Sequence, residues 1–338
     1  MRVICVDGGA SKAAGAIVEK LNRNTFKIEG EIIEERYNEQ EDFNHDFKPL
    51  ILAEQQKKGA LTKIETKQGK VYIKTIISII EKFMNKDKAL ISIAMPGIKT
   101  TNKKGIYVMA NGPRIPNLTQ QITDHFGKSI EILDLQSDAD MCAWGEEYGE
   151  NGSLRKVNSA YYFGGGTGIA DGLKLENQLC SFEQHSKWIA KCWELKLIDG
   201  NSLESLISMP GVNEEKNSRD KIAKNLALLF FERVQTVFKG WSNIFDIERQ
   251  LSNTHPYLGI IIDRIVIGQR LAEYLNTNSG KIIFNRVKDI FLEQCSAEDE
   301  SFRKNFTSND INEKIILSKL RESPIIGLGA KAWLQNEK

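Results

Sequence analysis

The sequence predicts an α/β protein made of two related lobes, and two similar glycine-rich turns are the main observation behind this prediction. The first turn, Asp7–Lys12, directly follows the apolar run Val3–Val6. The second turn, Gly164–Gly168, directly follows the apolar run Ala160–Phe163. Each turn is flanked by expected strands, so the two halves of the chain begin alike. Strands and helices alternate after the first turn, which indicates α/β layers.

The length, charge and cysteine content exclude several classes of protein. A chain of 338 residues suits two domains of ordinary size. Its net charge of +1 argues against nucleic-acid binding, and no apolar stretch approaches the roughly 18 residues that cross a bilayer. A strand is expected from residue 2, which leaves no room for a signal peptide, and five scattered cysteines argue against a disulfide framework. We therefore expect a cytoplasmic protein that binds neither nucleic acid nor a membrane.

The first half of the chain is expected to alternate short strands with helices. Its elements are, in order, strands at Arg2–Asp7, Ala13–Glu19 and Ile28–Tyr37, a helix at Val71–Met84, a strand at Leu90–Met95, a helix at Leu118–Phe126, a strand at Ile130–Leu135 and a helix at Asp138–Tyr148. Apolar residues spaced by three and four identify the helix at 71–84. The polar stretch from Asn38 to Lys67 predicts an irregular excursion.

The second half is expected to contain long helices and short strands. Its elements are, in order, a strand at Ile169–Leu175, helices at Arg219–Trp241 and Pro256–Leu275, strands at Ile282–Phe284 and Lys314–Leu317, and a final helix at Pro324–Leu334. The final helix carries Gly327 and Gly329, and small residues permit a helix to pack closely on another backbone.

Both glycine-rich turns suit an anion. Small residues let backbone N–H groups approach an anion closely, and the Ser11 and Thr167 hydroxyls add donors. Neither turn has the spacing of a Walker loop or of a Rossmann fingerprint. Asp138 lies between the two turns, at an expected strand-to-helix junction. Together these features predict a nucleotide held between the two lobes.

Five motifs in a fixed order resemble those of a known family. They are Asp7–Lys12, Met95–Gly97, Asp138–Glu146, Gly166–Gly172 and Leu203–Leu206. In this order the chain resembles the ROK family of sugar kinases, within the actin–hexokinase–heat-shock ATPase superfamily. The resemblance implies a two-lobed actin-like ATPase (ribonuclease H-like) fold with a nucleotide cleft between the lobes. It also implies an amino-terminal lobe of residues 1–128, to which residues 321–338 return, and a carboxy-terminal lobe of residues 129–320.

The resemblance also implies a reaction and the residues that carry it. The reaction is ATP-dependent phosphorylation of a sugar or amino-sugar hydroxyl, with Asp138 as general base and Mg²⁺ oriented by Asp7 through water. The residues implied to bind the nucleotide are Asp7, Gly9, Ser11, Lys12, Gly165, Gly166, Thr167 and Gly168. Those implied to bind the sugar are Asn111, Ser137 and Glu204. The oligomeric state stays open, with a homodimer as one option.

Each of these roles has a structural alternative. Asp138 would serve equally well as a helix N-cap, and Asp140 as a complement to the helix dipole. Asp7 would serve as a turn-capping residue before glycines. Lys12 would be solvated, and the residues 164–168 would form an ordinary hairpin.

The sequence also departs from the family pattern. Ser137 stands where the family usually has asparagine before the catalytic aspartate. The zinc cluster of the family is missing, and Cys180, His185 and Cys192 lack zinc-ligand spacing, so we expect no structural zinc. Glu183 and His185 are spaced one residue short of the family's E-x-x-H sugar clamp, which favours surface residues.

One further departure concerns the adenosine side. A third glycine-rich turn should follow the strand expected at Ile282–Phe284, where the sequence has Asn285, Arg286 and Val287. We expect these side chains to weaken nucleotide binding, or Arg286 to stack on the base. The alternative function is therefore a catalytically weak sugar-binding or regulatory protein of the same fold. No helix-turn-helix precedes the first strand, so the DNA-binding repressors of the family are a poor guide.

Overall fold

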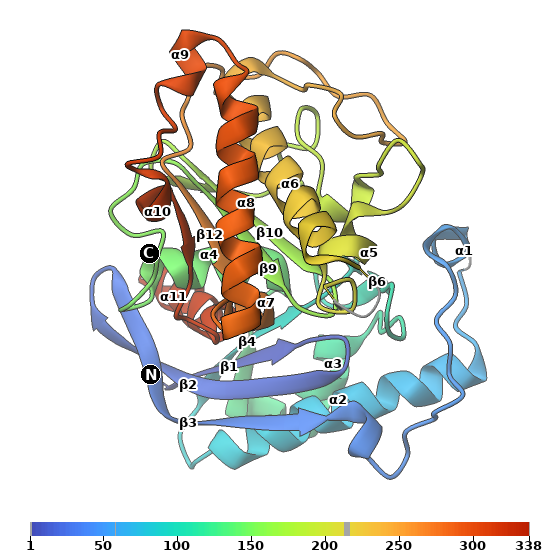
Figure 1. Cartoon of the computed structure of the whole chain (residues 1–338). Helices are drawn as coiled ribbons and strands as arrows, with labels where there is room; N and C mark the ends of the chain where they lie inside the picture. Colours follow the sequence, from blue (N-terminus) through green and yellow to red (C-terminus); the bar gives the residue numbers. More distant parts are fainter. Residues whose placement is uncertain (1, 58, 213–216, 338) are drawn as a thin grey trace. The chain divides into compact units, whose positions relative to one another are not determined.

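The computed structural model describes residues 2–57, 59–212 and 217–337, and the chain forms two compact units (Figure 1). Unit 1 consists of Met1–Glu150 and Glu322–Lys338, and unit 2 consists of Asn151–Arg321. This division places the first boundary after Glu150, whereas the sequence analysis expects it after residue 128. The strands β7 and β8 pair with β4, and helix α4 packs on the C-terminal helix, so the chain stays in unit 1 up to Glu150.

Unit 1 is built on a mixed sheet whose strand order is β3-β2-β1-β4-β7, with β8 also paired to β4. The strands are β1 (Arg2–Gly8), β2 (Lys12–Asn22), β3 (Thr25–Arg36), β4 (Ala89–Met95), β7 (Ile130–Ile132) and β8 (Gln136–Ser137). The strands β1, β2 and β3 form antiparallel hairpins, whereas β4 runs parallel to β1. A separate two-stranded sheet joins β5 (Ile98–Lys99) to β6 (Ile106–Val108).

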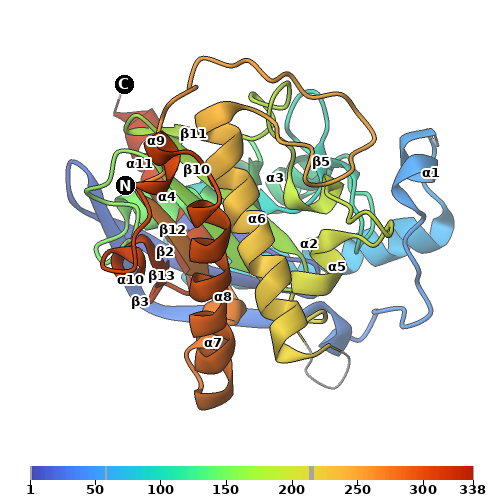
Figure 2. The ribbon, with the colours of Figure 1, turned by 45° about the horizontal axis from the view of Figure 1, so that its top comes forward.

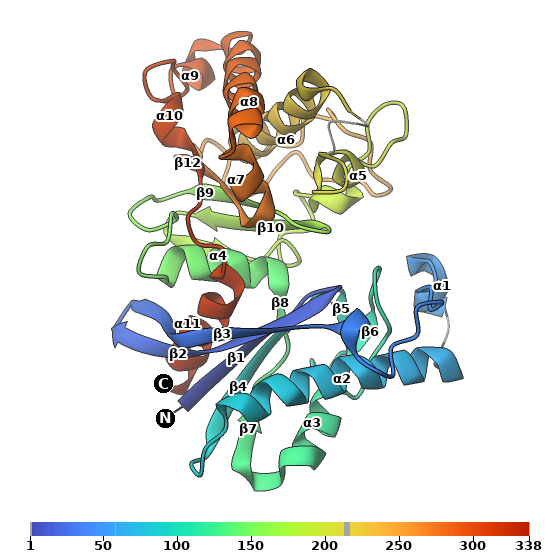
Figure 3. The same cartoon turned by 60° about the horizontal axis from the view of Figure 1, so that its bottom comes forward.

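Both faces of strand β1 are buried, which fits its continuous apolar sequence. Ile4 and Val6 belong to the hydrophobic core that helix α2 (Lys63–Phe83) completes. Val3 and Cys5 alternate with them and are also fully buried, outside that core. Helix α11 (Ser323–Asn336) contacts β1 and β2, and Figure 3 shows α2 and α4 on opposite sides of this sheet.

Small residues bring helix α11 against helix α4 (Asp138–Tyr148). A Cβ atom built on Gly327 would lie 2.0 Å from the Met141 carbonyl oxygen, and one built on Gly145 would lie 1.9 Å from the Ser323 carbonyl oxygen. Neither helix could approach so closely with a larger residue at these positions. The close packing expected from Gly327 is confirmed, and its partner is α4.

The polar excursion after β3 is more ordered than expected. It contains the short helix α1 (Leu52–Lys57), and α2 begins at Lys63 with Thr62 as its N-cap. The Gln55 side chain forms two hydrogen bonds with the Met109 backbone, at 2.8 Å and 2.9 Å. The segment therefore holds the loop that carries Asn111, between β6 and α3 (Leu118–Phe126).

A buried ion pair fixes the other end of this loop. Arg114 is 2% exposed, and its Nε and Nη2 each lie 2.8 Å from an oxygen of the Glu65 carboxylate. The Arg114 N–H also donates to Glu65 Oε1 at 3.2 Å. Burial raises the pKa of Glu65, but the hydrogen bonds and charge of Arg114 outweigh it, so that pKa is lowered overall. The pair joins α2 to the Asn111 loop in two parallel bonds.

Unit 2 is built on a five-stranded sheet of order β11-β10-β9-β12-β13. The strands are β9 (Ala160–Gly165), β10 (Ile169–Leu175), β11 (Gln178–Cys180), β12 (Arg264–Gly268) and β13 (Ile315–Leu317). Helices α6 (Arg219–Lys239) and α8 (Asn278–Ser296) lie side by side and supply much of its core (Figure 2). Short helices complete the unit: α5 (Leu203–Ile207), α7 (Gln269–Leu275), α9 (Glu300–Arg303) and α10 (Ile311–Lys314). Within the described residues, no helix is both long and apolar enough to cross a membrane.

A buried ionic network crosses the core of unit 2. Arg233 of α6 is fully buried, with Nη1 2.9 Å from Glu232 Oε2 and Nη2 3.3 Å from Asp171 Oδ1. The Tyr161 hydroxyl donates to the same Asp171 oxygen at 2.6 Å, and the Cys192 N–H donates to the other at 2.7 Å. Since Asp171 lies on β10, this network anchors the strand that follows the second glycine-rich turn.

Two expected elements of unit 2 are wrong. The segment expected as one helix at Pro256–Leu275 contains strand β12 and the short helix α7. The strand expected at Ile282–Phe284 lies inside helix α8, because Ile283, Val287 and Phe291 recur at helical spacing and are buried. The β-branched residues at 265–267 form strand β12. The sequence analysis missed this strand because the residues around it are also apolar.

We predict that Glu65→Gln lowers the free energy of unfolding by roughly 3 kcal/mol, because it removes the carboxylate that pairs with the buried Arg114 guanidinium group. The matched control is Glu81→Gln on the same helix, whose exposed pair with His125 should contribute less than about 1 kcal/mol. Urea unfolding of both variants at neutral pH measures the difference. Equal stabilities for the two variants would contradict the prediction.

The same variant should change how stability depends on pH. The lowered pKa of Glu65 means that its contribution is fully present above its unfolded pKa of roughly 4.3. That contribution disappears as the pH falls through the lower folded-state pKa. The stability gap between wild type and Glu65→Gln should therefore narrow on acidification, as urea unfolding at a series of acid pH values would record.

Candidate functional site

Asp7 stands at the carboxyl end of β1, in the middle of the unit 1 sheet. Its backbone pairs with Ala14 of β2 on one side and with Ala94 of β4 on the other. The Oδ1 oxygen is enclosed and has no hydrogen-bond partner in the described part of the chain. The pKa of Asp7 is raised to about 7, first by burial and then by the negative charge of Asp138, while Lys12 lowers it. A buried oxygen without a donor, beside a second carboxylate, is a position that a cation would stabilise.

Asp138 is the first residue of α4, and the residue before it performs the capping. The Ser137 hydroxyl accepts a hydrogen bond from the Asp140 N–H at 3.5 Å. The interpretation of Asp138 as the N-cap is therefore wrong, and Ser137 has this structural role. Among the described residues, none forms a hydrogen bond or an ion pair with the Asp138 carboxylate, which is partly exposed. Such a carboxylate is available to accept a proton.

The rest of the first glycine-rich turn is held by the protein itself. Lys12 forms an ion pair with Glu34 of β3, so its ammonium group already has a carboxylate partner. The Tyr37 N–H donates to the Ser11 carbonyl at 3.2 Å. A Cβ built on Gly9 would come no closer than 3.4 Å to another atom, so packing does not require glycine there. Contacts of Gly9, Ser11 and Lys12 with a phosphate stay predictions.

Asn111 lies exposed on the loop that Gln55 and Arg114 hold. No described hydrogen bond links it to Asp7 or Asp138. Unit 1 therefore brings the two aspartates together, while the sugar contact of Asn111 stays a prediction.

The second glycine-rich turn joins β9 to β10 in unit 2. The Gly166 N–H donates to the Gly168 carbonyl at 2.9 Å, and the Gly166 carbonyl accepts from the Met209 N–H at 3.0 Å. The glycines have different reasons for being there. A Cβ on Gly165 would lie 2.4 Å from the Leu271 Cβ, so packing requires this glycine, whereas the nearest atom to a Cβ on Gly166 is 3.3 Å away. Packing on the core therefore requires glycine at 165 more strictly than at 166.

Glu204 fastens this turn from helix α5. Its Oε1 accepts a hydrogen bond from the Ile169 N–H at 2.8 Å, at the first residue of β10. The same oxygen would lie 3.0 Å from a Cβ on Gly168. Glu204 was expected to bind sugar, and the structure gives it a second task in positioning the turn; its sugar contact stays a prediction.

Residues after strand β12 were missed by the sequence analysis. Gly268 pairs with Gly164 in parallel strands, so the residues that follow both glycines lie at the same edge of the sheet. The Arg270 Nη2 donates to the Thr167 Oγ1 at 3.2 Å. Gln269 has a φ of 58°, and its Oε1 would lie 3.3 Å from a Cβ on Gly166. A guanidinium group therefore accompanies the glycine-rich turn.

The adenosine-side expectation for Asn285–Val287 is wrong. These residues lie inside helix α8, where Asn285 is exposed and Val287 is buried in the core, and Arg286 pairs with Asp220 at 3.1 Å and with Glu293 at 3.4 Å. Arg286 therefore forms ion pairs on the surface of unit 2. The structure gives no basis for the expected effect of these side chains on nucleotide binding. The strand in this region is β12, and the residues that follow it are Gln269 and Arg270. The sequence analysis had placed both residues in the helix expected at Pro256–Leu275.

The cysteines and histidine considered for zinc have other surroundings. Cys180 and Cys192 are buried, and burial raises the pKa of both thiols. His185 packs against Trp188 and Tyr257, each with ring centroids 5.6 Å away. Among the described residues, no group of three or more histidine, cysteine, aspartate or glutamate side chains is arranged to hold a metal ion. Glu183, near the expected sugar clamp, forms an ion pair with Lys191 at 3.1 Å.

No family model matches the sequence, and no curated protein resembles it in sequence. Solved structures do resemble the fold. One is the inorganic polyphosphate/ATP-glucomannokinase from Arthrobacter sp. strain KM, with 14% identity, a TM-score of 0.59 and 99% of each chain covered. Another is a ROK family glucokinase from Streptomyces griseus in complex with glucose and AMPPNP, with 11% identity, a TM-score of 0.60, and 98% of this chain and 99% of that chain covered.

A glucokinase from Parabacteroides distasonis is similar as well, with 15% identity and a TM-score of 0.53, and the match covers 100% of this chain and 98% of that chain. Identities this low carry information about the fold alone. The predicted mixed α/β fold is confirmed: this chain shares the fold of these solved sugar kinases.

Proposed function

We propose that the protein is an ATP-dependent kinase that phosphorylates a sugar or amino-sugar hydroxyl, with Asp138 as general base. The observation that carries this proposal is the pair of carboxylates in unit 1. Asp138 is relieved of capping by Ser137 and has no described partner, and its charge raises the pKa of the enclosed Asp7. The solved structures of similar fold support the reaction class, since one of them is a glucokinase complexed with glucose and AMPPNP.

The residues of unit 1 fit a divalent cation. Mg²⁺ prefers carboxylate oxygens, water and phosphate oxygens. Asp7 offers an enclosed oxygen that lacks a donor, and Asp138 adds a second negative charge beside it. We assign Mg²⁺ binding to Asp7, directly or through water, where the metal would neutralise charge on the phosphate groups of ATP.

The acceptor chemistry is assigned to Asp138. Moving a phosphoryl group to a hydroxyl requires a base that removes the hydroxyl proton. The Asp138 carboxylate would accept that proton, and its position at the first turn of α4 holds it on a rigid element.

The phosphate contacts are assigned to unit 2. Residues 166–168 belong to a glycine-rich turn that hydrogen bonds from Ile169 to Glu204 and from Met209 to Gly166 hold in place. Thr167 and Arg270 add a hydroxyl and a guanidinium group to the same turn. A guanidinium group forms two parallel hydrogen bonds with phosphate, which suits both binding and stabilisation of the negative charge that develops during transfer.

We predict that Asp138→Asn lowers turnover by roughly 10²–10⁴-fold, because the base is lost while the side-chain shape is kept. The sugar dissociation constant should change little. The matched control is Asp140→Asn on the same helical turn, which should keep most of the activity. Steady-state kinetics of ATP consumption with the preferred sugar measures both, and a variant at residue 138 with more than half of wild-type turnover would eliminate Asp138 as base.

We also predict that Arg270→Ala raises the KM for ATP by roughly tenfold, the loss expected for one charge-assisted hydrogen bond. Arg270→Lys should be intermediate, since it keeps the charge and loses the paired geometry. Arg286→Ala is the control, because its guanidinium group is engaged with Asp220 and Glu293 on the surface. Unchanged kinetics in Arg270→Ala would remove this residue from the phosphate site.

One screen separates the kinase from the alternative of a sugar-binding or regulatory protein. ATP consumption would be followed with hexoses, amino sugars and N-acylated amino sugars as acceptors. Turnover with any of them that Asp138→Asn abolishes supports the kinase. Sugar binding by calorimetry without turnover for any acceptor would support the alternative.

A further inference from the structure

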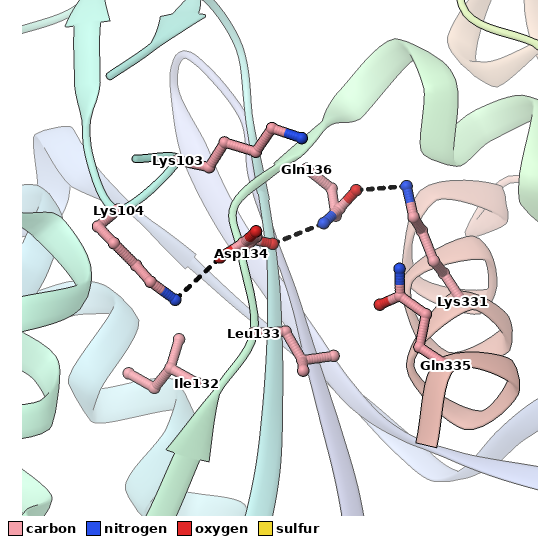
Figure 4. A pocket seen from close by; sticks show the side chains of 8 residues that line it. All are labelled: Lys103, Lys104, Ile132, Leu133, Asp134, Gln136, Lys331 and Gln335. Carbon is pink, nitrogen blue, oxygen red and sulfur yellow. Dashed lines mark hydrogen bonds and ion pairs between the residues drawn. The ribbon is translucent and has the colours of Figure 1, made fainter. Parts of the chain in front are cut away.

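A polar pocket of about 330 Å³ lies in unit 1, apart from the residues assigned above (Figure 4). Three segments line it: the β5–β6 loop, the chain between β7 and β8, and the last turns of α11. The side chains used below are Lys103, Lys104, Asp134, Gln136, Lys331 and Gln335. A volume of this size is at the lower end of the range for small-molecule sites, which is roughly 300–1,000 Å³.

The pocket carries an excess of positive charge. Asp134 is the one carboxylate in the lining, and Lys104 pairs with it at 3.0 Å. The ammonium groups of Lys103 and Lys331 are left without a carboxylate partner among the described residues. Two ammonium groups without an ion-pair partner match the charge of one phosphate monoester.

Lys331 is held in a position where its charge is poorly solvated. Its Nζ donates to Gln136 Oε1 at 2.6 Å and lies 5.4 Å from the centre of the Trp144 ring. Burial lowers the pKa of Lys331, Asp140 raises it and the charge of Lys103 lowers it, with a net lowering. An anion between Lys103 and Lys331 would offset both the lost hydration of the Lys331 charge and its repulsion by Lys103.

The backbone fixes Lys103 as well. Lys103 has a φ of 55°, a left-handed backbone conformation that residues other than glycine rarely adopt. Its carbonyl accepts a hydrogen bond from the Leu135 N–H at 2.9 Å, which ties the β5–β6 loop to the chain leading into β8. The loop is thereby held where Figure 4 shows the Lys103 side chain extending toward Gln136 and Lys331.

The remaining groups favour a hydroxylated ligand over a nucleotide. The Gln136 amide accepts from Lys331 Nζ and donates to the Asp134 carbonyl oxygen, which leaves it one N–H and one lone pair for a hydroxyl group, and the Gln335 amide can also donate or accept. None of the lining side chains is aromatic, so a nucleobase would have no ring to stack on.

We propose that this pocket binds the phosphate ester of a small sugar, with Lys103 and Lys331 on the phosphate group and the two glutamine amides on hydroxyl groups. The site does not depend on phosphoryl transfer by the protein. Its occupant would lie against Gln136, two residues before Asp138 on the same strand-to-helix segment.

The test is calorimetric titration of the full chain with glucose 6-phosphate in a low-salt, phosphate-free buffer without ATP or Mg²⁺. Lys331→Gln and Lys103→Gln should each weaken binding by roughly tenfold, because each removes one charged contact. Lys128→Gln is the matched control: it removes one exposed lysine charge from unit 1 outside the pocket and should leave binding unchanged. Inorganic phosphate should bind more weakly than the sugar phosphate.

Three results would overturn the proposal. One is no binding of glucose 6-phosphate by wild type at millimolar concentration. Another is binding that neither pocket variant weakens, since the ligand would then occupy another site. The third is equal affinity for glucose 6-phosphate and inorganic phosphate, which would exclude a sugar subsite. Thermal unfolding of Lys331→Gln checks folding, and Lys103→Gln keeps the test valid if that variant is unstable, because Lys103 is exposed.

Discussion

Parallel strand pairing is the constraint on which the candidate residues of each unit depend. Within unit 1, β1 forms a hairpin with β2 and runs parallel to β4, and within unit 2, β9 forms a hairpin with β10 and runs parallel to β12. The two sheets therefore share one strand order, β3-β2-β1-β4-β7 and β11-β10-β9-β12-β13. In each sheet the glycine-rich hairpin turn lies at the edge where the parallel strands end. Asp7 lies at the carboxyl end of β1, and Asp138 and Arg270 follow the parallel strands β8 and β12, so these three candidate residues lie where parallel strands end.

The sequence predicted the parts of this arrangement that local patterns encode. The strands β1 and β9, the glycine-rich turns and helices α6 and α11 follow from apolar runs, small residues and helical spacing. The secondary structure of residues 256–287 was predicted wrongly, because several apolar runs lie next to one another there. The residues at 265–267 and at 282–284 have similar composition, yet the first form a strand between β9 and β13 while the second continue a helix on α6. Only the tertiary partners distinguish them.

The candidate site was predictable in its residue types and less so in its contacts. Asp138 was found from its place at a helix start, but the sequence could not assign the capping to Ser137, because both residue types are good N-caps. The run of glycines suggested a uniform phosphate-binding turn. In the structure Gly165 packs closely on Leu271, whereas a Cβ on Gly166 or Gly168 would meet a side-chain oxygen of Gln269 or Glu204, at 3.3 Å and 3.0 Å. Whether such a residue has a structural role depends on its burial and on the atoms that it contacts, which the sequence alone does not give.

Gln269 shows why the edge of the second sheet is specialised. A left-handed backbone costs a residue with a Cβ roughly 1–2 kcal/mol, which glycine would avoid. The chain keeps this conformation with a glutamine, next to an arginine that reaches Thr167. The turn from β12 into α7 therefore requires a left-handed backbone at residue 269, and the chain has a glutamine there rather than a glycine. Strain of this kind is maintained where the side chain has a task, and the neighbouring glycine-rich turn is the feature that Gln269 and Arg270 share.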